Sequence, residues 1–189
     1  GTVVGKKRGS GLLFYPEELD HFLEELYSNI NIPVSIKTRI GFNSEDEWYE
    51  IAEIYSKYPI EELTIHPRIQ KDFYKNSPRL DAFKHATEVI NCPLCYNGDI
   101  TSVESFSKIH NEFPDINRLI MEEFVLLNSA DYLPVEFELF MSLVSTINRD
   151  RDDLNVWLIG NTLNKANPYF EGLGINIDKL HIYPGQLRL

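Results

Sequence analysis

Two kinds of hydrophobic pattern alternate along the chain. Apolar residues recur at helical spacing in some stretches and form short runs, typical of buried strands, in others. The helical stretches are residues 16–30, 44–58, 77–90, 102–113 and 134–150, and the strand-like runs are residues 34–40, 62–67, 94–100, 118–124 and 155–161. Residues 167–185 add a short helix, a glycine-rich turn and a strand around 180–183. Short strands that alternate with helices indicate βαβ units and a parallel sheet, so we predict the α/β class.

Residue types at the predicted helix starts agree with this division. Pro16 suits the first position of a helix, where its missing N–H is not needed. Ser44 and Glu47 have the spacing of a capping box. Thr101 or Ser102 can cap the helix that follows the third strand. We therefore expect the helices to begin soon after the strands end.

Length and charge limit what the chain can be. Its 189 residues are too few for a complete (β/α)₈ barrel, which takes about 250. A net charge of −11 argues against broad nonspecific binding of nucleic acid, although residues 6–8 leave a local basic site open. No apolar run is long enough to span a membrane and no signal peptide begins the chain, so we expect a cytoplasmic protein. The chain opens with Gly1, and its only methionines are Met121 and Met141, so we expect a cut piece or a processed product.

The two cysteines form a single C-x-x-C motif, Cys92 and Cys95. A structural zinc site usually takes four ligands, and the chain has no second cysteine pair, so we expect no metal site. A redox-active dithiol is one interpretation of the motif. The other, which we prefer, is a pair of small apolar residues at the entrance of a buried strand.

Polar residues gather where the first three predicted strands end. They are Lys37 and Arg39 on one face of the first strand, His66 and Arg68 at the end of the second, and Asn97, Gly98 and Asp99 after the third. Gly98 permits close approach of the backbone, and the helix that follows offers N–H groups to a phosphate. Lys37 can hold an electron-accepting ring system, and His66 can donate a hydrogen bond to it. The pattern predicts a site for a phosphorylated cofactor, although each residue alone also fits a structural role.

Four segments in this order and spacing resemble the tRNA-dihydrouridine synthases: "SGLLFYPEEL", "VSIKTRIG", "LTIHPR" and "CYNGDI". The resemblance covers about residues 1–117. It implies part of an FMN-dependent TIM barrel that reduces a uridine of tRNA with NADPH. By resemblance, Lys37, His66 and the turn Asn97-Gly98-Asp99 contact FMN. Arg39 and Arg68 then lie near the flavin or the RNA.

The chain also departs from that family's pattern. The family's catalytic cysteine stands in an Asn-x-Gly-Cys-Pro segment that would precede Gly1, and neither Cys92 nor Cys95 matches it. The family's Gly-Arg-Gly phosphate contact is replaced by Met121-Glu122-Glu123, whose carboxylates would repel a phosphate. We therefore assign no catalytic residue and expect the chain to be inactive alone.

The strand before Glu122 and Glu123 allows a second interpretation. An apolar strand that ends in two carboxylates suits Mg²⁺-nucleotide chemistry, with Asn161 at the next strand end and Arg149 between them. Residues 117–175 resemble the DNA-packaging ATPases of small tailed phages. That resemblance implies that Glu122 contacts the metal, Glu123 is the catalytic carboxylate, Arg149 is the trans-acting arginine and Asn161 is the sensor. A solvated strand end explains the same acids, and the chain has no P-loop.

Together these features predict a partial barrel over residues 1–117 that continues into an ATPase-like βαβ segment over residues 118–189. Three function hypotheses follow. The first is a fragment of a tRNA-dihydrouridine synthase, with FMN, NADPH and tRNA. The second is a fragment of a packaging ATPase, with ATP, Mg²⁺, phage DNA and the prohead. The third is a non-catalytic α/β domain. We expect a chimeric or truncated origin, and self-association through unpaired sheet edges.

Overall fold

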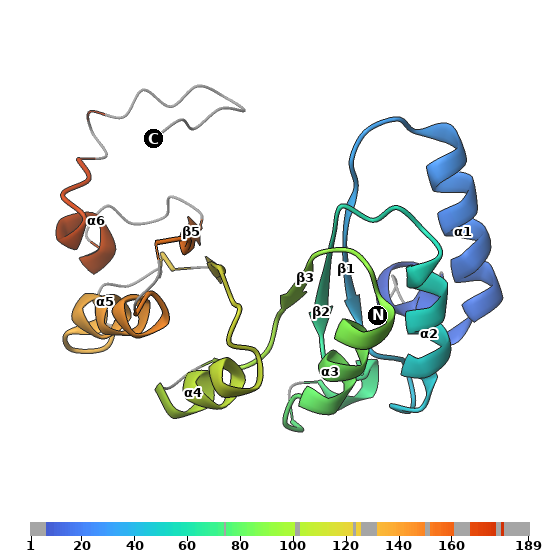
Figure 1. Cartoon of the computed structure of the whole chain (residues 1–189), viewed down its shortest axis with the longest axis horizontal. Helices are drawn as coiled ribbons and strands as arrows, with labels where there is room; N and C mark the ends of the chain where they lie inside the picture. Colours follow the sequence, from blue (N-terminus) through green and yellow to red (C-terminus); the bar gives the residue numbers. More distant parts are fainter. Residues whose placement is uncertain are drawn as a thin grey trace. The chain divides into compact units, whose positions relative to one another are not determined.

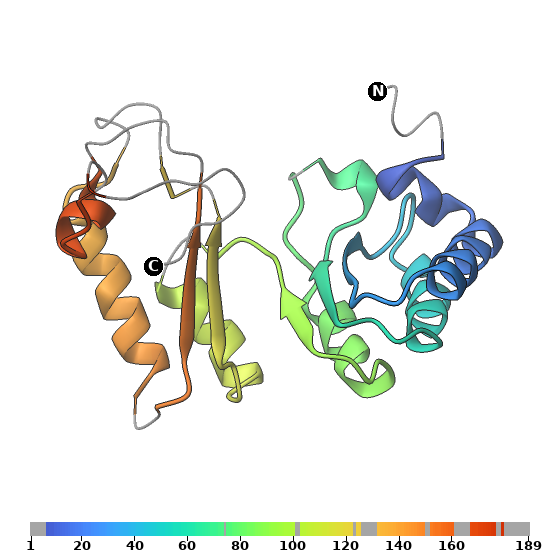
Figure 2. The same cartoon turned by 90° about the horizontal axis from the view of Figure 1, so that it is seen from above.

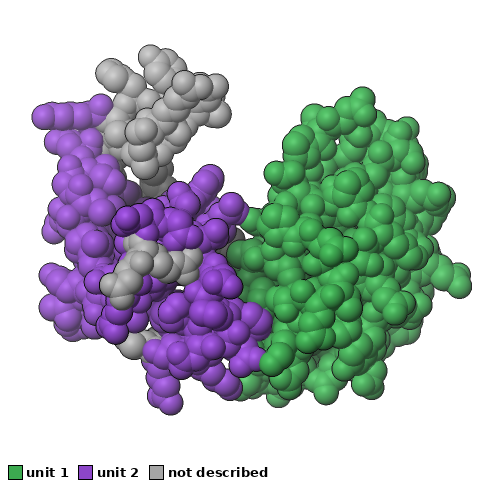
Figure 3. Space-filling view, viewed as in Figure 1, with its two compact units in different colours: residues 1–101 green, residues 102–189 purple. Residues whose placement is uncertain are grey.

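The computed structural model describes residues 7–73, 75–100, 103–122, 124–125, 132–149, 152–160, 167–176 and 179. The chain divides into two compact units, residues 1–101 and residues 102–189, which Figure 3 shows in separate colours. Each unit has its own parallel sheet.

The first unit is built on three parallel strands. They are β1 (Ser35–Arg39), β2 (Glu62–His66) and β3 (Leu94–Tyr96), in the order β1-β2-β3 (Figure 1). The helices are α1 (Pro16–Asn29), α2 (Glu47–Ser56) and α3 (Leu80–Val89), with short 3-10 turns η2 (Gly9–Phe14) and η3 (Gln70–Asp72). Each strand lies beside the strand that precedes it in the chain, which is how strands follow one another around a (β/α) barrel.

Helices cover one face of this sheet. The register aligns Thr38, Ile65 and Tyr96, so their side chains point to the same face. On that face the hydroxyl of Tyr55, from α2, lies 2.9 Å from Thr38 Oγ1, and the ring of Phe83, from α3, packs edge-on against Tyr96. Ile65 is fully buried. Figure 2 shows the three helices against the strands from a second direction.

The start of α2 modifies the predicted capping box. Glu47 is the first helical residue rather than the third. Its carboxylate accepts hydrogen bonds from the backbone N–H groups of Phe42, Asn43 and Ser44, and Ser44 Oγ accepts one from Asp46 N at 3.2 Å. The Glu47 half of the box is therefore present. The Ser44 hydroxyl, however, accepts the N–H of Asp46 instead of the N–H of Glu47. Pro16 stands at the first position of α1, as predicted.

The second unit contains a two-stranded parallel sheet, β4 (Arg118–Glu122) and β5 (Asn155–Ile159), with α4 (Val103–Glu112), α5 (Glu136–Ile147) and α6 (Pro168–Gly172). Its core is an aromatic cluster around Tyr169, which is 1% exposed. Asn167 caps α6 by accepting the N–H groups of Tyr169 and Phe170. The strand predicted around 180–183 lies outside the described residues.

The α/β class and the parallel strands are confirmed. Among the described residues, β3 and β4 belong to different sheets, so each unit carries its own set of parallel strands. The compact units divide after Thr101, so α4 belongs to the second unit. The boundary predicted at 117/118 stays a prediction. Within the described part of the chain, no helix is long and apolar enough to cross a membrane.

Candidate functional site

The face of the first sheet opposite the helices is polar. Lys37 and Arg39 alternate with Thr38 along β1, so they point away from α2. The register aligns Arg39 with His66, which places the end of β2 beside the end of β1 on this face. Asn97 follows β3 directly, and its backbone N–H donates to Ile65 O at 2.9 Å. The structure therefore brings Lys37, Arg39, His66 and Asn97 to the carboxyl ends of three adjacent parallel strands, where ligands bind in such folds.

His66 is the buried member of this group, with 8% of its surface exposed. Its Nε2 lies 3.2 Å from Arg68 Nη1. Burial lowers the pKa of His66 to about 4, and the positive charges of Arg39, Arg68 and Lys37 act in the same direction, opposed by Asp99. The imidazole is therefore neutral at pH 7.

Arg68 lies inside the protein, with only 2% of its side chain exposed. Its Nε donates to the backbone carbonyl of Asn76 at 2.5 Å. Its two terminal nitrogens donate to the two carboxylate oxygens of Asp99, Nη1 at 2.9 Å and Nη2 in a shorter contact. This bidentate pair joins the loop after β2 to the loop after β3, and it lowers the pKa of the Asp99 carboxyl.

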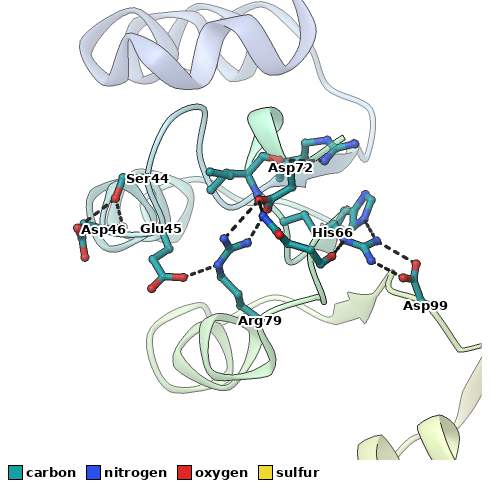
Figure 4. A network of polar contacts seen from close by, with 11 residues as sticks. Ser44, Glu45, Asp46, His66, Asp72, Arg79 and Asp99 are labelled. Carbon is teal, nitrogen blue, oxygen red and sulfur yellow. Dashed lines mark hydrogen bonds and ion pairs between the residues drawn. The ribbon is translucent and has the colours of Figure 1, made fainter. Parts of the chain in front are cut away.

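The polar network continues from Asn76 to a buried carboxylate, Asp72 (Figure 4). Asp72 is 2% exposed and accepts from Asn76 Nδ2 at 2.5 Å, from Ile69 N at 2.9 Å and from Arg79 Nη1 at 2.6 Å. The Arg79 guanidinium lowers the pKa of Asp72 to about 2. Arg79 also pairs with Glu45, at the start of α2. The loop that carries Arg68 is therefore fixed by charge pairs at both ends.

Sequence reasoning missed Asp72 and Arg79. Both stand in a polar stretch between β2 and α3, residues 67–79, which has the composition of an ordinary surface loop. An acid and a base seven residues apart in such a loop are too common to single out. Their burial depends on how the loop folds back over Pro67, whose carbonyl accepts the N–H of Arg79 at 2.8 Å.

Arg39 and Arg68, the two arginines predicted to lie near the flavin or the RNA, have different surroundings in the structure. Arg39 is partly buried, and its Nη1 donates to the carbonyl of Ile69 at 3.2 Å. Arg68 is enclosed by Asp99, His66 and Asn76, so its guanidinium does not reach an RNA-accessible surface in this conformation. The structure shows Arg68 buried, and its contact with RNA stays a prediction.

Gly98 has a neighbour that the sequence did not indicate. A Cβ at this position would lie 2.3 Å from Tyr96 Oη, so the space beside Gly98 is taken by the ring of Tyr96. The absence of a side chain is explained by this packing as well as by the predicted approach of a phosphate. Thr101 and Ser102, the predicted caps of the next helix, lie outside the described residues.

The cysteines offer little support for redox chemistry. Cys92 and Cys95 are both partly buried. Burial raises the pKa of the Cys92 thiol, which disfavours the thiolate that a reactive cysteine needs. Among the described residues, no group of three or more histidine, cysteine or acidic side chains is placed to hold a metal ion.

The residues of the alternative ATPase site are only partly described. The register aligns Glu122 with Ile159, so β4 and β5 end at the same edge of their sheet. Arg149 is exposed after the end of α5. Glu123 and Asn161 lie outside the described residues. The ATPase interpretation therefore stays a prediction.

Comparison with known proteins finds a family match over the part of the chain that carries the first site. Residues 1–116 match the family described as Dihydrouridine synthase (Dus). Among similar proteins, tRNA-dihydrouridine synthase B of Pasteurella multocida is 34% identical over 103 residues, which are 54% of this chain and 31% of that protein. The enzyme of the same name from Escherichia coli is 32% identical over 100 residues, 52% of this chain and 31% of that protein. The chain thus spans about a third of the length of these relatives. Because the family match covers more than half of the chain, the chain belongs to the dihydrouridine synthase family.

Proposed function

We propose that the first unit forms part of an FMN site in an enzyme that reduces a uridine of tRNA, with NADPH as the reductant. One observation carries the proposal. Lys37, Arg39 and His66 meet at the carboxyl ends of adjacent parallel strands, within the region that matches the family. The names of the relatives, tRNA-dihydrouridine synthase B, support tRNA as the substrate.

The charges at this face suit an anionic, phosphorylated cofactor. Lys37, Arg39 and Arg68 are all close enough to His66 to lower its pKa, in a chain whose net charge is −11. Asp99 acts on His66 in the opposite direction, and its carboxylate is paired with Arg68. The site therefore concentrates positive charge where the rest of the chain is acidic.

Each residue has a chemical role in holding the cofactor. Lys37, on the exposed side of β1, would place its ammonium against an electron-rich edge of the flavin, and His66 would donate a hydrogen bond to the ring. The turn Asn97-Gly98-Asp99 would meet the phosphate through its backbone N–H groups. When bound, a flavin supplies two-electron oxidation and reduction. Arg39 remains the candidate for contact with RNA.

The test is a titration of the chain with FMN, followed by quenching of flavin fluorescence. We expect saturable binding, and we expect Lys37→Ala to weaken it about tenfold to a hundredfold, because a charged hydrogen bond is lost. Lys84→Ala is the matched control. Lys84 is an exposed lysine of α3, on the helical side of the sheet, so its removal changes the net charge equally but leaves the polar face intact.

Two outcomes contradict the proposal. One is the absence of binding at about millimolar FMN, which corresponds to less than about 4 kcal/mol of binding free energy. The other is an equal loss of affinity in Lys37→Ala and Lys84→Ala, which would mean that net charge rather than the polar face attracts the ligand.

A further inference from the structure

We propose that Arg68 is a positioning residue that fixes the proton of His66 on Nδ1. The inference rests on the proposed flavin site, in which it says which nitrogen of His66 carries the proton. Arg68 itself is enclosed by protein and touches no ligand in this scheme.

The first step is the direction of the hydrogen bond between the two residues. Arg68 Nη1 and His66 Nε2 are 3.2 Å apart and both are buried. A guanidinium has only donors, so His66 Nε2 must accept with its lone pair. A neutral imidazole with a lone pair on Nε2 carries its proton on Nδ1.

The second step is what holds Arg68 against the ring. Three oxygen atoms from two segments bind the guanidinium besides His66: the carbonyl oxygen of Asn76 and both carboxylate oxygens of Asp99. A planar guanidinium bound on several edges cannot turn away from Nε2 without giving up these bonds. The tautomer of His66 is therefore set by a rigid donor, and not by solvent.

The third step is the protonation state. Burial disfavours an imidazolium at this position, and the charges of Arg39, Arg68 and Lys37 do the same, whereas Asp99 favours it. An imidazolium would also point Nε2–H at a guanidinium N–H. His66 therefore stays neutral and offers one defined donor, Nδ1–H, instead of a mixture of tautomers.

This arrangement suits recognition of the oxidised flavin ring, whose polar edge carries both acceptors and a donor. A histidine of mixed tautomers would present a lone pair for part of the time. A proton fixed on Nδ1 before binding avoids the free-energy cost of selecting one tautomer when the flavin binds. Arg68 would thus affect cofactor affinity without contacting the cofactor.

The test reads the tautomer directly by nitrogen-15 NMR of the imidazole rings at pH 7, in protein without flavin. In the wild type we expect the shifts of His66 to show a protonated Nδ1 and a bare Nε2. In Arg68→Gln we expect a mixture, because a glutamine amide accepts as well as donates and so satisfies either tautomer. Arg39→Gln is the matched control: it removes the same charge near His66, but Arg39 donates to Ile69 O, so we expect the Nδ1–H form to persist.

A second variant covers the case in which Arg68→Gln does not fold. Asp99→Asn changes a side chain that is 51% exposed and releases Arg68 from its charged anchor. We expect a larger fraction of Nε2–H than in the wild type. A wild-type ring protonated on Nε2 overturns the proposal, and so does an unchanged tautomer in each variant that folds.

FMN affinity then separates this inference from the proposed function. If FMN binds the wild type, Arg68→Gln should weaken binding about threefold to tenfold, as expected for loss of one defined hydrogen bond. If FMN does not bind, the proposed function fails while the tautomer result stands. If FMN binds but the tautomer of the apo protein is Nε2–H, this inference alone fails.

Discussion

Replacing Asp72 by alanine is expected to lower the free energy of unfolding of the first unit by about 3–5 kcal/mol. The carboxylate is 2% exposed and binds Arg79, Asn76 and the N–H of Ile69. Its removal leaves the Arg79 guanidinium with the exposed Glu45 as its ion-pair partner, and it takes the acceptor away from Asn76 Nδ2 and Ile69 N, whose desolvation is then uncompensated. The loss should be measured by urea denaturation.

Tryptophan fluorescence can report on the first unit alone. Trp48 is 1% exposed in α2, and its indole N–H donates to Ala82 O of α3 at 2.8 Å. Trp157, the other tryptophan, is in β5 of the second unit. In a Trp157→Phe background the fluorescence change therefore follows the packing of α2 on α3, which is close to Arg79 and Glu45.

The matched control is an exposed ion pair of the same unit. Lys57 Nζ lies 2.6 Å from Asp20 Oδ2, with 53% of the lysine side chain exposed. Lys57→Ala should cost no more than about 1 kcal/mol, because water screens such pairs. Equal losses of unfolding free energy in Asp72→Ala and Lys57→Ala would contradict the view that the buried Asp72 network stabilises the unit more than an exposed ion pair does.

The residues on the strands of the site were predictable from the sequence, whereas the buried contacts of Arg68 were not. Lys37 and Arg39 were recognisable because two cations at i and i+2 on an apolar strand must share one face. The parallel sheet followed from the alternation of strands and helices. These inferences need only local periodicity, and the structure agrees with the class and the strand direction.

The role of Arg68 was not predictable from the same information. An arginine directly after a strand looks like a surface residue poised for an anionic partner. Its burial requires Asp99, 31 residues later, to bring a carboxylate to it, and requires the loop carrying Asn76 to fold over it. Gly98 is similar: its neighbour is Tyr96, two residues earlier, whose ring direction depends on packing against Phe83 of α3. Contacts between distant segments decide both.

Lowering the pH from 7 to 4 is expected to remove about 3 kcal/mol of stability from the first unit through His66 alone. The pKa of His66 is about 4 in the folded protein, against 6.5 for a free histidine. Between these values the unfolded chain takes up a proton that the folded chain does not, so acid favours unfolding. The loss begins as the pH falls below 6.5 and is complete near pH 4. Urea denaturation at a series of pH values measures it.

The Asp72 carboxylate affects the free energy of unfolding at lower pH than His66 does. The pKa of Asp72 is about 2 when folded, against 3.8 for a free aspartate, so its contribution is present above pH 3.8 and is lost as the pH falls toward 2. The slope between pH 6.5 and 4 therefore separates His66 from Asp72. His66→Gln should flatten that slope, whereas His21→Gln, which removes an exposed histidine of α1, should retain it. If the slope is the same in the wild type and in His66→Gln, the imidazole is not the buried neutral group that the Arg68 contact requires.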